Sequence, residues 1–429
     1  MRKSDFLVLS FFIKLYFCQN QRQIYTIAVN IFKSLLPLLA KANKSIAKFY
    51  QGRKNLFQKL EKDTRHLNNP IWIHAASLGE YEQAVPLIEV FKSKGYEVVV
   101  SFFSPSGYDI KKNDNLIDVA TYLPLDTKSD MQKFVKIINP KMALFIKYDV
   151  WPNLMKILKQ KDIPTYLISA NFRENQIYFK WYGNFFLKAL QSFDIVFVQN
   201  KESEKLAQEL HLKSIEISGD TRYDRVIKQL TYNNHIDRID EFINNKLCTV
   251  CGSTWPEDEE VLSKVINKSK EQEKFIIAPH KVDANHIKDI EQLLQKKSIC
   301  WSEIEPETNL NTFQILIIDC IGLLTKLYSY ADIAYVGGAI GQTGLHNILE
   351  PACFGKPVIF GHHHDKFPEA QELINAKASF DIKNHEDLKT IYQRLKNSDQ
   401  LRQGIGKNAK AFIEKNAGAT DLIMRQIID

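Results

Sequence analysis

Short apolar and β-branched runs alternate with helical patterns from Ile71 onward, at the spacing of βαβ units. The first series predicts five parallel strands: IWIHAA (71–76), EVVVSFF (97–103), MALFIKY (142–148), TYLISA (165–170) and IVFVQ (195–199). The second series predicts another five: LCTVCGST (247–254), KFIIAPH (274–280), FQILIID (313–319), IAYVGG (333–338) and PVIFG (357–361). The polar segment 219–234 between them is the best candidate for a linker. The pattern predicts an α/β protein with two Rossmann-like sheets and a cleft between them, where ligands bind beyond the carboxyl ends of the strands.

Two apolar stretches precede the first predicted strand. Residues 6–17 are interrupted by Lys14 and are shorter than the roughly 20 residues of a spanning helix, and no signal-peptide cleavage site follows them. Residues 25–39 precede a Lys-rich run, which is typical of an anchor in the membrane interface. An ordinary helix packed on the body and a short spanning signal anchor are the alternatives.

The charge of the chain is unevenly distributed. The 429 residues, 45% hydrophobic and 25% charged, suit two globular domains. Residues 1–60 contain eleven Lys or Arg and one acid, whereas the rest of the chain is close to neutral. Such a basic arm indicates an anionic partner, either a membrane surface or a nucleic acid, and the apolar content favours the membrane. No basic patch interleaved with aromatic residues supports a nucleic-acid partner.

Candidate chemistry first appears after the first predicted strand, in the run HAASLGE at 74–80. Gly79 would allow a tight turn, Ser77 could cap the helix that follows, and Glu80 would lie at the amino terminus of that helix. A carboxylate there can act as a general base that removes the proton of an acceptor hydroxyl. The alternative is an acid that only complements the helix dipole.

A glycine-rich segment at 337–351 follows the predicted strand IAYVGG. Its glycines would let the backbone approach a ligand, and the amides that open a helix carrying Asn347 and Glu350 could hold a phosphate. His346 and Glu350 are four residues apart and would share one face of that helix. The spacing is neither GxGxxG nor a P-loop. The alternative is that the glycines only permit close packing.

Further polar residues follow other predicted strands. Ser253 and Thr254 form a hydroxyl-rich turn, which could instead be a plain N-cap by Thr254. Asp149 ends the third strand, and Arg173 follows the fourth, where it would suit a carboxylate or phosphate. We expect the histidines at 362–364 to be a polar rim rather than a metal site. The lone CxxC at 248–251 lacks a partner pair, so we expect no metal and a reducing cytoplasm.

Seven motifs in their order resemble the 3-deoxy-D-manno-octulosonic acid (Kdo) transferases of lipopolysaccharide synthesis, as a Bacteroidetes-like variant: HAASLGE, DVWPN, ANFR, GDTRYDRV, CGSTW, GLHNILEPACFGKPVIFG and KFPEA. The resemblance implies a GT-B fold, with two Rossmann-like domains facing a central cleft and an N-terminal membrane-associating helix. It implies CMP-Kdo as donor, lipid A precursor (lipid IVA) as acceptor, inversion at the anomeric carbon, and neither metal nor cofactor. The implied location is the cytoplasmic face of the inner membrane.

The resemblance also implies domains and residue roles. Residues 1–45 would be the membrane-associating segment, 46–225 the acceptor domain and 226–429 the donor domain, with the last helix crossing back to the acceptor domain. Glu80 would be the general base. The acceptor would contact Ser77, Gly79, Asp149 and Arg173. The donor would contact Ser253, Thr254, His280, Gly337, Gly338, Gly344, His346, Asn347 and Glu350.

Three departures from the family pattern stand out. Lys147 occupies a position where many relatives have an acid. Lys281 follows His280 at a place where many relatives have Pro-Arg-His. Lys281 would therefore replace the arginine as a cation, without the planar fork of its guanidinium group. Residues 1 to about 22 precede the familiar start, as a lineage-specific addition or through an upstream start codon. The rival hypothesis is another GT-B transferase, or a sugar-nucleotide epimerase, that uses a UDP-sugar.

Overall fold

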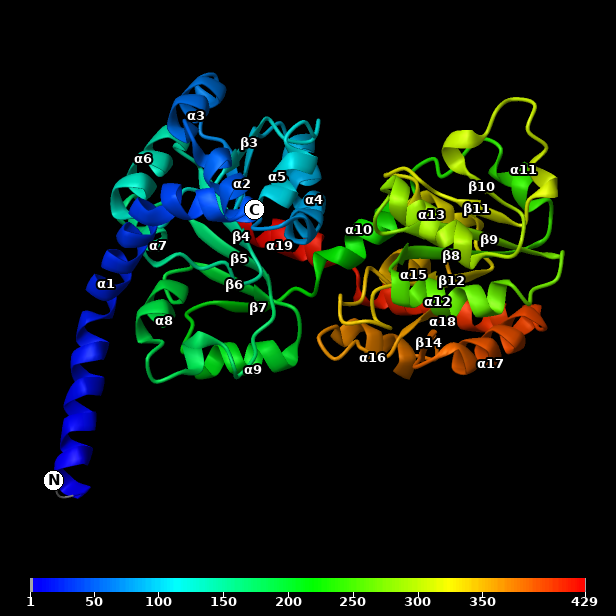
Figure 1. Ribbon diagram of the computed structural model, residues 1–429. Helices are drawn as coiled ribbons and strands as arrows, with labels where there is room; N and C mark the ends of the chain where they lie inside the picture. The colour runs from blue at the N-terminus through cyan, green and yellow to red at the C-terminus, as the bar shows by residue number, and fades with distance from the viewer. Residues whose placement is uncertain (1–2, 429) are drawn as a thin grey trace. The chain divides into compact units, whose positions relative to one another are not determined.

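A computed structural model describes the backbone of residues 3–428 and the side chains of residues 21–428. The chain divides into two compact units (Figure 1): unit 1 is Met1–Arg225 with Gly418–Asp429, and unit 2 is Val226–Ala417. The boundary lies inside the segment 219–234 predicted as a linker, and part of this segment is helical. Residues Thr221–Gln229 form helix α10, which buries Tyr223 and Val226.

Unit 1 is built on a seven-stranded sheet in the order β3-β2-β1-β4-β5-β6-β7, in which all neighbouring strands are parallel. The five predicted strands are present, and two short ones were not predicted. The strands are β1 (Ile71–His74), β2 (Val98–Phe102), β3 (Val119–Tyr122), β4 (Met142–Ile146), β5 (Thr165–Ala170), β6 (Ile195–Val198) and β7 (Ile215–Ile217).

Helices cover both faces of this sheet, so its central strands are buried on both sides, as their continuous apolar runs require. The helices are α2 (Lys44–Arg53), α3 (Leu56–Thr64), α4 (Leu78–Ser93), α5 (Pro105–Lys111), α6 (Lys128–Ile138), α7 (Pro152–Gln160), α8 (Asn184–Leu190), α9 (Lys201–Glu209) and α19 (Ala419–Ile428), with a 3₁₀ turn η1 (Ile177–Phe179). The last of them, α19, contributes Ile423, Met424 and Ile427 to one of the two cores.

Unit 2 repeats this architecture with a second parallel sheet in the order β10-β11-β9-β8-β12-β13-β14. Its strands are β8 (Leu247–Thr254), β9 (Glu273–Pro279), β10 (Ser298–Cys300), β11 (Ile315–Ile317), β12 (Ile333–Val336), β13 (Val358–Gly361) and β14 (Ser379–Ile382). Its helices are α11 (Ile239–Ile243), α12 (Pro256–Ile266), α13 (Ala284–Leu293), α14 (Leu324–Leu327), α15 (Leu349–Cys353), α16 (Pro368–Asn375), α17 (His385–Lys396) and α18 (Asp399–Asn416), with 3₁₀ turns η2 (Trp301–Glu303), η3 (Leu310–Thr312) and η4 (Tyr328–Tyr330). The prediction of two Rossmann-like sheets is therefore confirmed.

Helix α1 (Lys3–Ala42) precedes unit 1's sheet and has two different faces. On one face the Tyr25 hydroxyl donates to Asp126 Oδ2 (3.0 Å), Lys33 pairs with Asp130, and Leu36 is buried. The opposite side exposes large apolar side chains: Ile24, Ile27, Ile31, Leu35 and Leu38. The part Gln21–Ala42 is long and apolar enough to cross a membrane, by length and composition. The alternative of a helix packed on the body thus explains only one face. The side chains of the apolar run 6–17 lie outside the described residues.

Candidate active site

The first candidate site lies at the carboxyl edge of the unit 1 sheet, where α4 begins after β1. Ser77 is the N-cap residue of α4, and Glu80 is the third residue of the helix. The backbone N–H of Ser77 donates to Glu80 Oε2 (2.8 Å), and the Ser77 hydroxyl donates to the same oxygen (3.1 Å). Glu80 therefore does complement the helix terminus, as the alternative interpretation held. This role leaves its second carboxylate oxygen for other chemistry.

The surroundings of Glu80 favour its neutral form. Burial raises the pKa of the Glu80 carboxyl, and the nearby charge of Asp149 raises it further. The charges of Lys147 and His74 act in the opposite direction and lower this pKa. The net result is a raised pKa, which is what a carboxylate base that must accept a proton requires.

Asp149 is held in place by a chain of buried hydrogen bonds. His74 Nε2 lies 2.7 Å from Asp149 Oδ2, and His74 Nδ1 lies 2.8 Å from the Ser101 hydroxyl. The Trp72 indole N–H donates to that hydroxyl (2.8 Å). His74 Nδ1 also lies 3.0 Å from the Ser101 backbone carbonyl oxygen, so both ring nitrogens of His74 have partners. His74 was part of the HAASLGE motif but received no role, and its position at the end of a buried strand was the available signal.

The other two predicted acceptor residues lie at the same edge. Gly79 is inside the first turn of α4, and a Cβ placed on it would meet open space. The prediction that Gly79 makes the turn tight is wrong, because the capping box of Ser77 and Glu80 forms this turn. Arg173 is exposed in the loop after β5, where its backbone N–H donates to Gln176 Oε1 (3.1 Å).

The second candidate site is built around a buried carboxylate in unit 2. Asp258 Oδ2 accepts the backbone N–H groups of Gly338 (2.8 Å) and Trp255 (3.0 Å), and Oδ1 accepts the Tyr335 hydroxyl (2.7 Å). Asp258 therefore joins the loop after β12 to the start of α12 after β8. Burial raises the pKa of Asp258, and these hydrogen bonds oppose that rise. Sequence reasoning missed this residue.

The glycines of this site serve close packing and turns. A Cβ on Gly337 would lie 2.4 Å from the Ser253 carbonyl oxygen and 2.8 Å from Asp258 Oδ2. Gly338 and Gly344 have φ of +98° and +100°, which favour glycine. The close-packing alternative is thus correct for Gly337. The same packing brings the backbone of the loop after β12 next to the backbone of the loop after β8.

An aromatic stack lies next to these loops. The rings of Trp255 and His280 are stacked with centroids 4.6 Å apart, and His280 lies 4.6 Å from His346. The Trp255 indole N–H donates to His346 Nε2 (3.0 Å), and the Lys281 ammonium lies 5.1 Å from the Trp255 ring centroid. Burial, and then the proximity of His280, lowers the pKa of His346 to about 4. His346 is therefore a neutral acceptor, and Lys281 is the cation at this stack.

Two predictions about this region are wrong: that Asn347 belongs to the helix after the glycines, and that His346 and Glu350 share one face of that helix. The helix after the glycines, α15, begins at Leu349, so His346 and Glu350 do not share a helical face. The chain stays non-helical because the N–H of Gly344 donates to the Gly338 carbonyl (3.0 Å) and that of His346 to the Gly337 carbonyl (3.2 Å). Asn347 instead donates to Glu350 Oε1 (3.1 Å).

The hydroxyl-rich turn also differs from its prediction. Trp255, not Thr254, is the N-cap residue of α12. Thr254 is buried in β8, and its hydroxyl donates to Glu259 Oε1 (2.8 Å). Ser253 has φ of +52°, a left-handed conformation that is rare for serine. The Thr254 side chain therefore supports the loop, whereas Ser253 is partly exposed at its surface.

Solved structures of other proteins share the two-sheet architecture. UDP-GlcNAc 2-epimerase from Neisseria meningitidis aligns with a TM-score of 0.59 at 14% identity, covering 84% of this chain and 99% of that chain. MurG from Acinetobacter baumannii aligns with a TM-score of 0.54 at 13% identity, over 84% and 99% of the two chains. These likenesses, with the two parallel sheets, define a protein of the GT-B fold.

Sequence comparisons show which family this chain resembles. Residues 48–225 match the family model of 3-deoxy-D-manno-octulosonic-acid transferase (kdotransferase). Kdo transferases from Rickettsia felis and Aquifex aeolicus are 28% and 27% identical to this chain, covering 86% and 81% of it and 81% and 91% of those proteins. A bifunctional glycosyltransferase/methyltransferase from Fusobacterium nucleatum is 27% identical over 81% of this chain, which spans only 55% of that longer protein. The chain is a glycosyltransferase, and it is similar to the Kdo transferases over most of its length.

Proposed function

We propose that this enzyme transfers Kdo from CMP-Kdo to the lipid A precursor lipid IVA in lipopolysaccharide synthesis. The anomeric configuration would invert, Glu80 would be the general base, and the reaction would take place at the cytoplasmic face of the inner membrane. The observation that carries the role of Glu80 is its raised pKa beside Asp149, at the carboxyl edge of the unit 1 sheet.

The proposed step is a single displacement. The acceptor hydroxyl oxygen forms a bond to the anomeric carbon of Kdo while the bond from that carbon to the CMP phosphate oxygen breaks. Glu80 takes the hydroxyl proton, and CMP leaves with the bonding electron pair. Asp149, oriented by His74, keeps negative charge close to Glu80 and so strengthens it as a base.

The donor would lie on the loops of unit 2. Protein atoms of the neighbouring loop residues occupy the space where side chains of Gly337 and Gly338 would lie, and Asp258 fixes the turn that these glycines form. Because α15 begins only at Leu349, we propose that the CMP phosphate contacts the loop at 338–347 rather than a helix terminus. Lys281 supplies positive charge beside the Trp255 stack, while His346 contributes a neutral ring.

The exposed side of α1 would bring the enzyme to the bilayer. Six large apolar side chains between Ile24 and Leu38 are 39–64% exposed, and the surrounding segment is basic. Apolar residues in the acyl boundary and lysines at anionic headgroups are the two forces that hold interfacial helices.

The experiment is release of CMP from CMP-Kdo by the purified full chain with lipid IVA, combined with the mass of the lipid product. We expect a gain of one or more Kdo units, and CMP should inhibit while UDP should not. A lipid of unchanged mass beside an active control enzyme, or inhibition by UDP alone, would support the rival UDP-sugar enzyme.

A further inference from the structure

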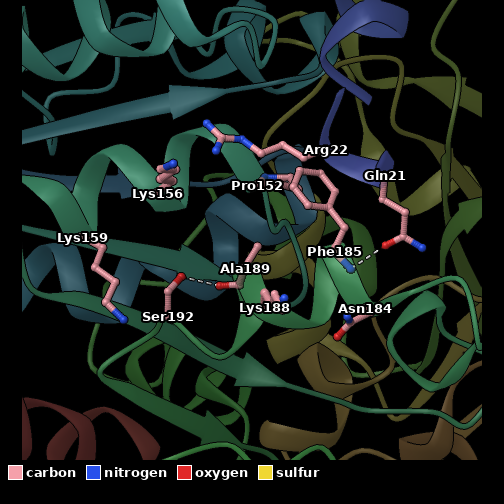
Figure 2. A pocket seen from close by; sticks show the side chains of 10 residues that line it. All are labelled: Gln21, Arg22, Pro152, Lys156, Lys159, Asn184, Phe185, Lys188, Ala189 and Ser192. Carbon is pink, nitrogen blue, oxygen red and sulfur yellow. Dashed lines mark hydrogen bonds between the residues drawn. The ribbon is translucent and has the colours of Figure 1, made fainter. Parts of the chain in front are cut away.

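A basic pocket of about 330 Å³ lies in unit 1, between α1, α7 and α8. Figure 2 shows its lining residues, with Arg22 from α1, Lys156 and Lys159 from α7, and Lys188 from α8. No acid is among the lining residues within the part of the chain that the structure describes. The proposed transfer reaction assigns no role to this pocket.

The pocket wall is fixed by a buried amide. Gln21 is 8% exposed, and its Nε2 donates to the Tyr182 carbonyl (2.7 Å). The backbone N–H of Phe185 donates to Gln21 Oε1 (2.9 Å), a contact drawn in Figure 2. One turn further along α1, the Tyr25 ring contacts Phe185 (5.4 Å between centroids) and Phe186 (5.6 Å). These contacts hold α1 against α8, so the pocket exists before any ligand binds.

The lining combines positive charge with apolar surface. Arg22, Lys156, Lys159 and Lys188 are all exposed, and none of them takes part in an ion pair among the described residues. Four unpaired cations around one concave site repel each other, so an anion there is favourable. The Phe185 ring and Ala189 line the same pocket, which suits a ligand whose charged group is attached to an apolar body.

We propose that this pocket binds the phosphate headgroup of an anionic phospholipid of the membrane. Arg22 lies two residues before Ile24, the first of the exposed apolar side chains of α1. In a phospholipid layer the phosphates lie next to the acyl chains. The same layer can therefore contact both the basic pocket and the exposed apolar side of α1. The site deepens the proposed membrane association and rests on it. Specific binding in a pocket also differs from a diffuse attraction of lysines to the surface.

The test is co-flotation of the full chain with vesicles of phosphatidylcholine, with and without phosphatidylglycerol. Each cation near an anionic surface should contribute about fivefold to partitioning, so Lys156→Gln with Lys188→Gln should weaken binding to phosphatidylglycerol vesicles by about 25-fold. Binding to pure phosphatidylcholine should stay unchanged. The matched control is Lys201→Gln with Lys205→Gln on α9, which removes the same charge from another exposed part of unit 1.

Three outcomes would contradict the proposal that this pocket binds a phospholipid headgroup. An equal loss in the α9 control would indicate diffuse electrostatics, and a loss of binding to neutral vesicles would indicate a structural role of the lysines. A raised KM for lipid IVA dispersed in detergent would assign the pocket to the acceptor. The flotation needs no CMP-Kdo, so its result is independent of whether the transfer reaction is correct.

Discussion

Replacing Asp258 by alanine should disrupt the donor loops of unit 2. The carboxylate accepts three hydrogen bonds, from the N–H groups of Gly338 and Trp255 and from the Tyr335 hydroxyl, and it is fully buried. A buried donor without a partner costs about 1–3 kcal/mol, so Asp258→Ala should lower the free energy of unfolding of unit 2 by roughly 3 kcal/mol or more. Asp258→Asn should cost about 1 kcal/mol, because the amide oxygen can serve both N–H groups and the Tyr335 hydroxyl can turn to accept from the amide.

The assay is urea unfolding followed by tryptophan fluorescence, with a separate transition fitted for each unit. Trp255 and Trp301 report on unit 2, and Glu260→Ala, on the exposed side of the same helix, is the matched control. Calorimetry of CMP binding should show a Kd about tenfold or more higher for Asp258→Ala, equivalent to about 1.4 kcal/mol, and a smaller change for Asp258→Asn. If Asp258→Ala unfolds and binds CMP like Glu260→Ala, the carboxylate does not organise the donor loops.

Three further predictions concern pH, the membrane face and the acceptor edge. Because the pKa of His346 is about 4 when folded and about 6.5 when unfolded, the unfolded chain binds the additional proton, and the Tm of unit 2 should fall as pH drops from about 6.5 to about 4. His346→Gln should reduce this slope, and a slope equal to that of the unaltered protein would refute the assignment. Ile31→Gln with Leu35→Gln should reduce vesicle binding at unchanged Tm, and unchanged flotation would exclude this face of α1 as the anchor. Gly79→Ala should stabilise α4 by about 0.4–1 kcal/mol yet raise the KM for the acceptor alone, and an unaltered KM would place Gly79 outside the acceptor site.

The sequence predicted the central strands of both sheets and missed the peripheral ones. Strands such as β1 and β8 are buried on both faces and therefore appear as continuous apolar runs. The missed strands β3, β7, β10 and β14 are three or four residues long and lie at the two outer positions of each sheet. Residues 215–217 (IEI) are half-buried, so no apolar run marks β7.

The candidate site was predictable where a residue lies within a few positions after the end of a strand. Glu80 and Asp149 follow β1 and β4, and parallel strands bring their carboxyl ends to one edge. Asp258 and the link from His74 to Asp149 depend on hydrogen bonds between segments that are 75 or more residues apart, which no local pattern encodes. The late start of α15 was missed for a different reason: the N–H groups of Gly344 and His346 bond to the carbonyls of Gly338 and Gly337 within one loop, which delays the helix.

Glu80→Gln tests the central claim most directly. Glutamine at the third helical position can still accept the Ser77 N–H, so the capping box and the fold should survive, whereas an amide cannot take a proton. General-base catalysis typically contributes about 10²–10⁴-fold, so kcat for Kdo transfer to lipid IVA should fall by about that factor. CMP binding should remain unchanged. The raised pKa of Glu80 also predicts that kcat/KM of the unaltered enzyme falls on the acid side above the ordinary glutamate value of 4.5.

The measurement is the rate of Kdo addition to lipid IVA, followed by product mass, for Glu80→Gln beside Glu61→Gln, an exposed glutamate on α3 of the same unit. We expect a loss of about 10²-fold or more for Glu80→Gln and an almost unchanged rate for Glu61→Gln. A folded Glu80→Gln enzyme that adds Kdo at a near-normal rate would show that Glu80 only caps α4 and that another group removes the proton.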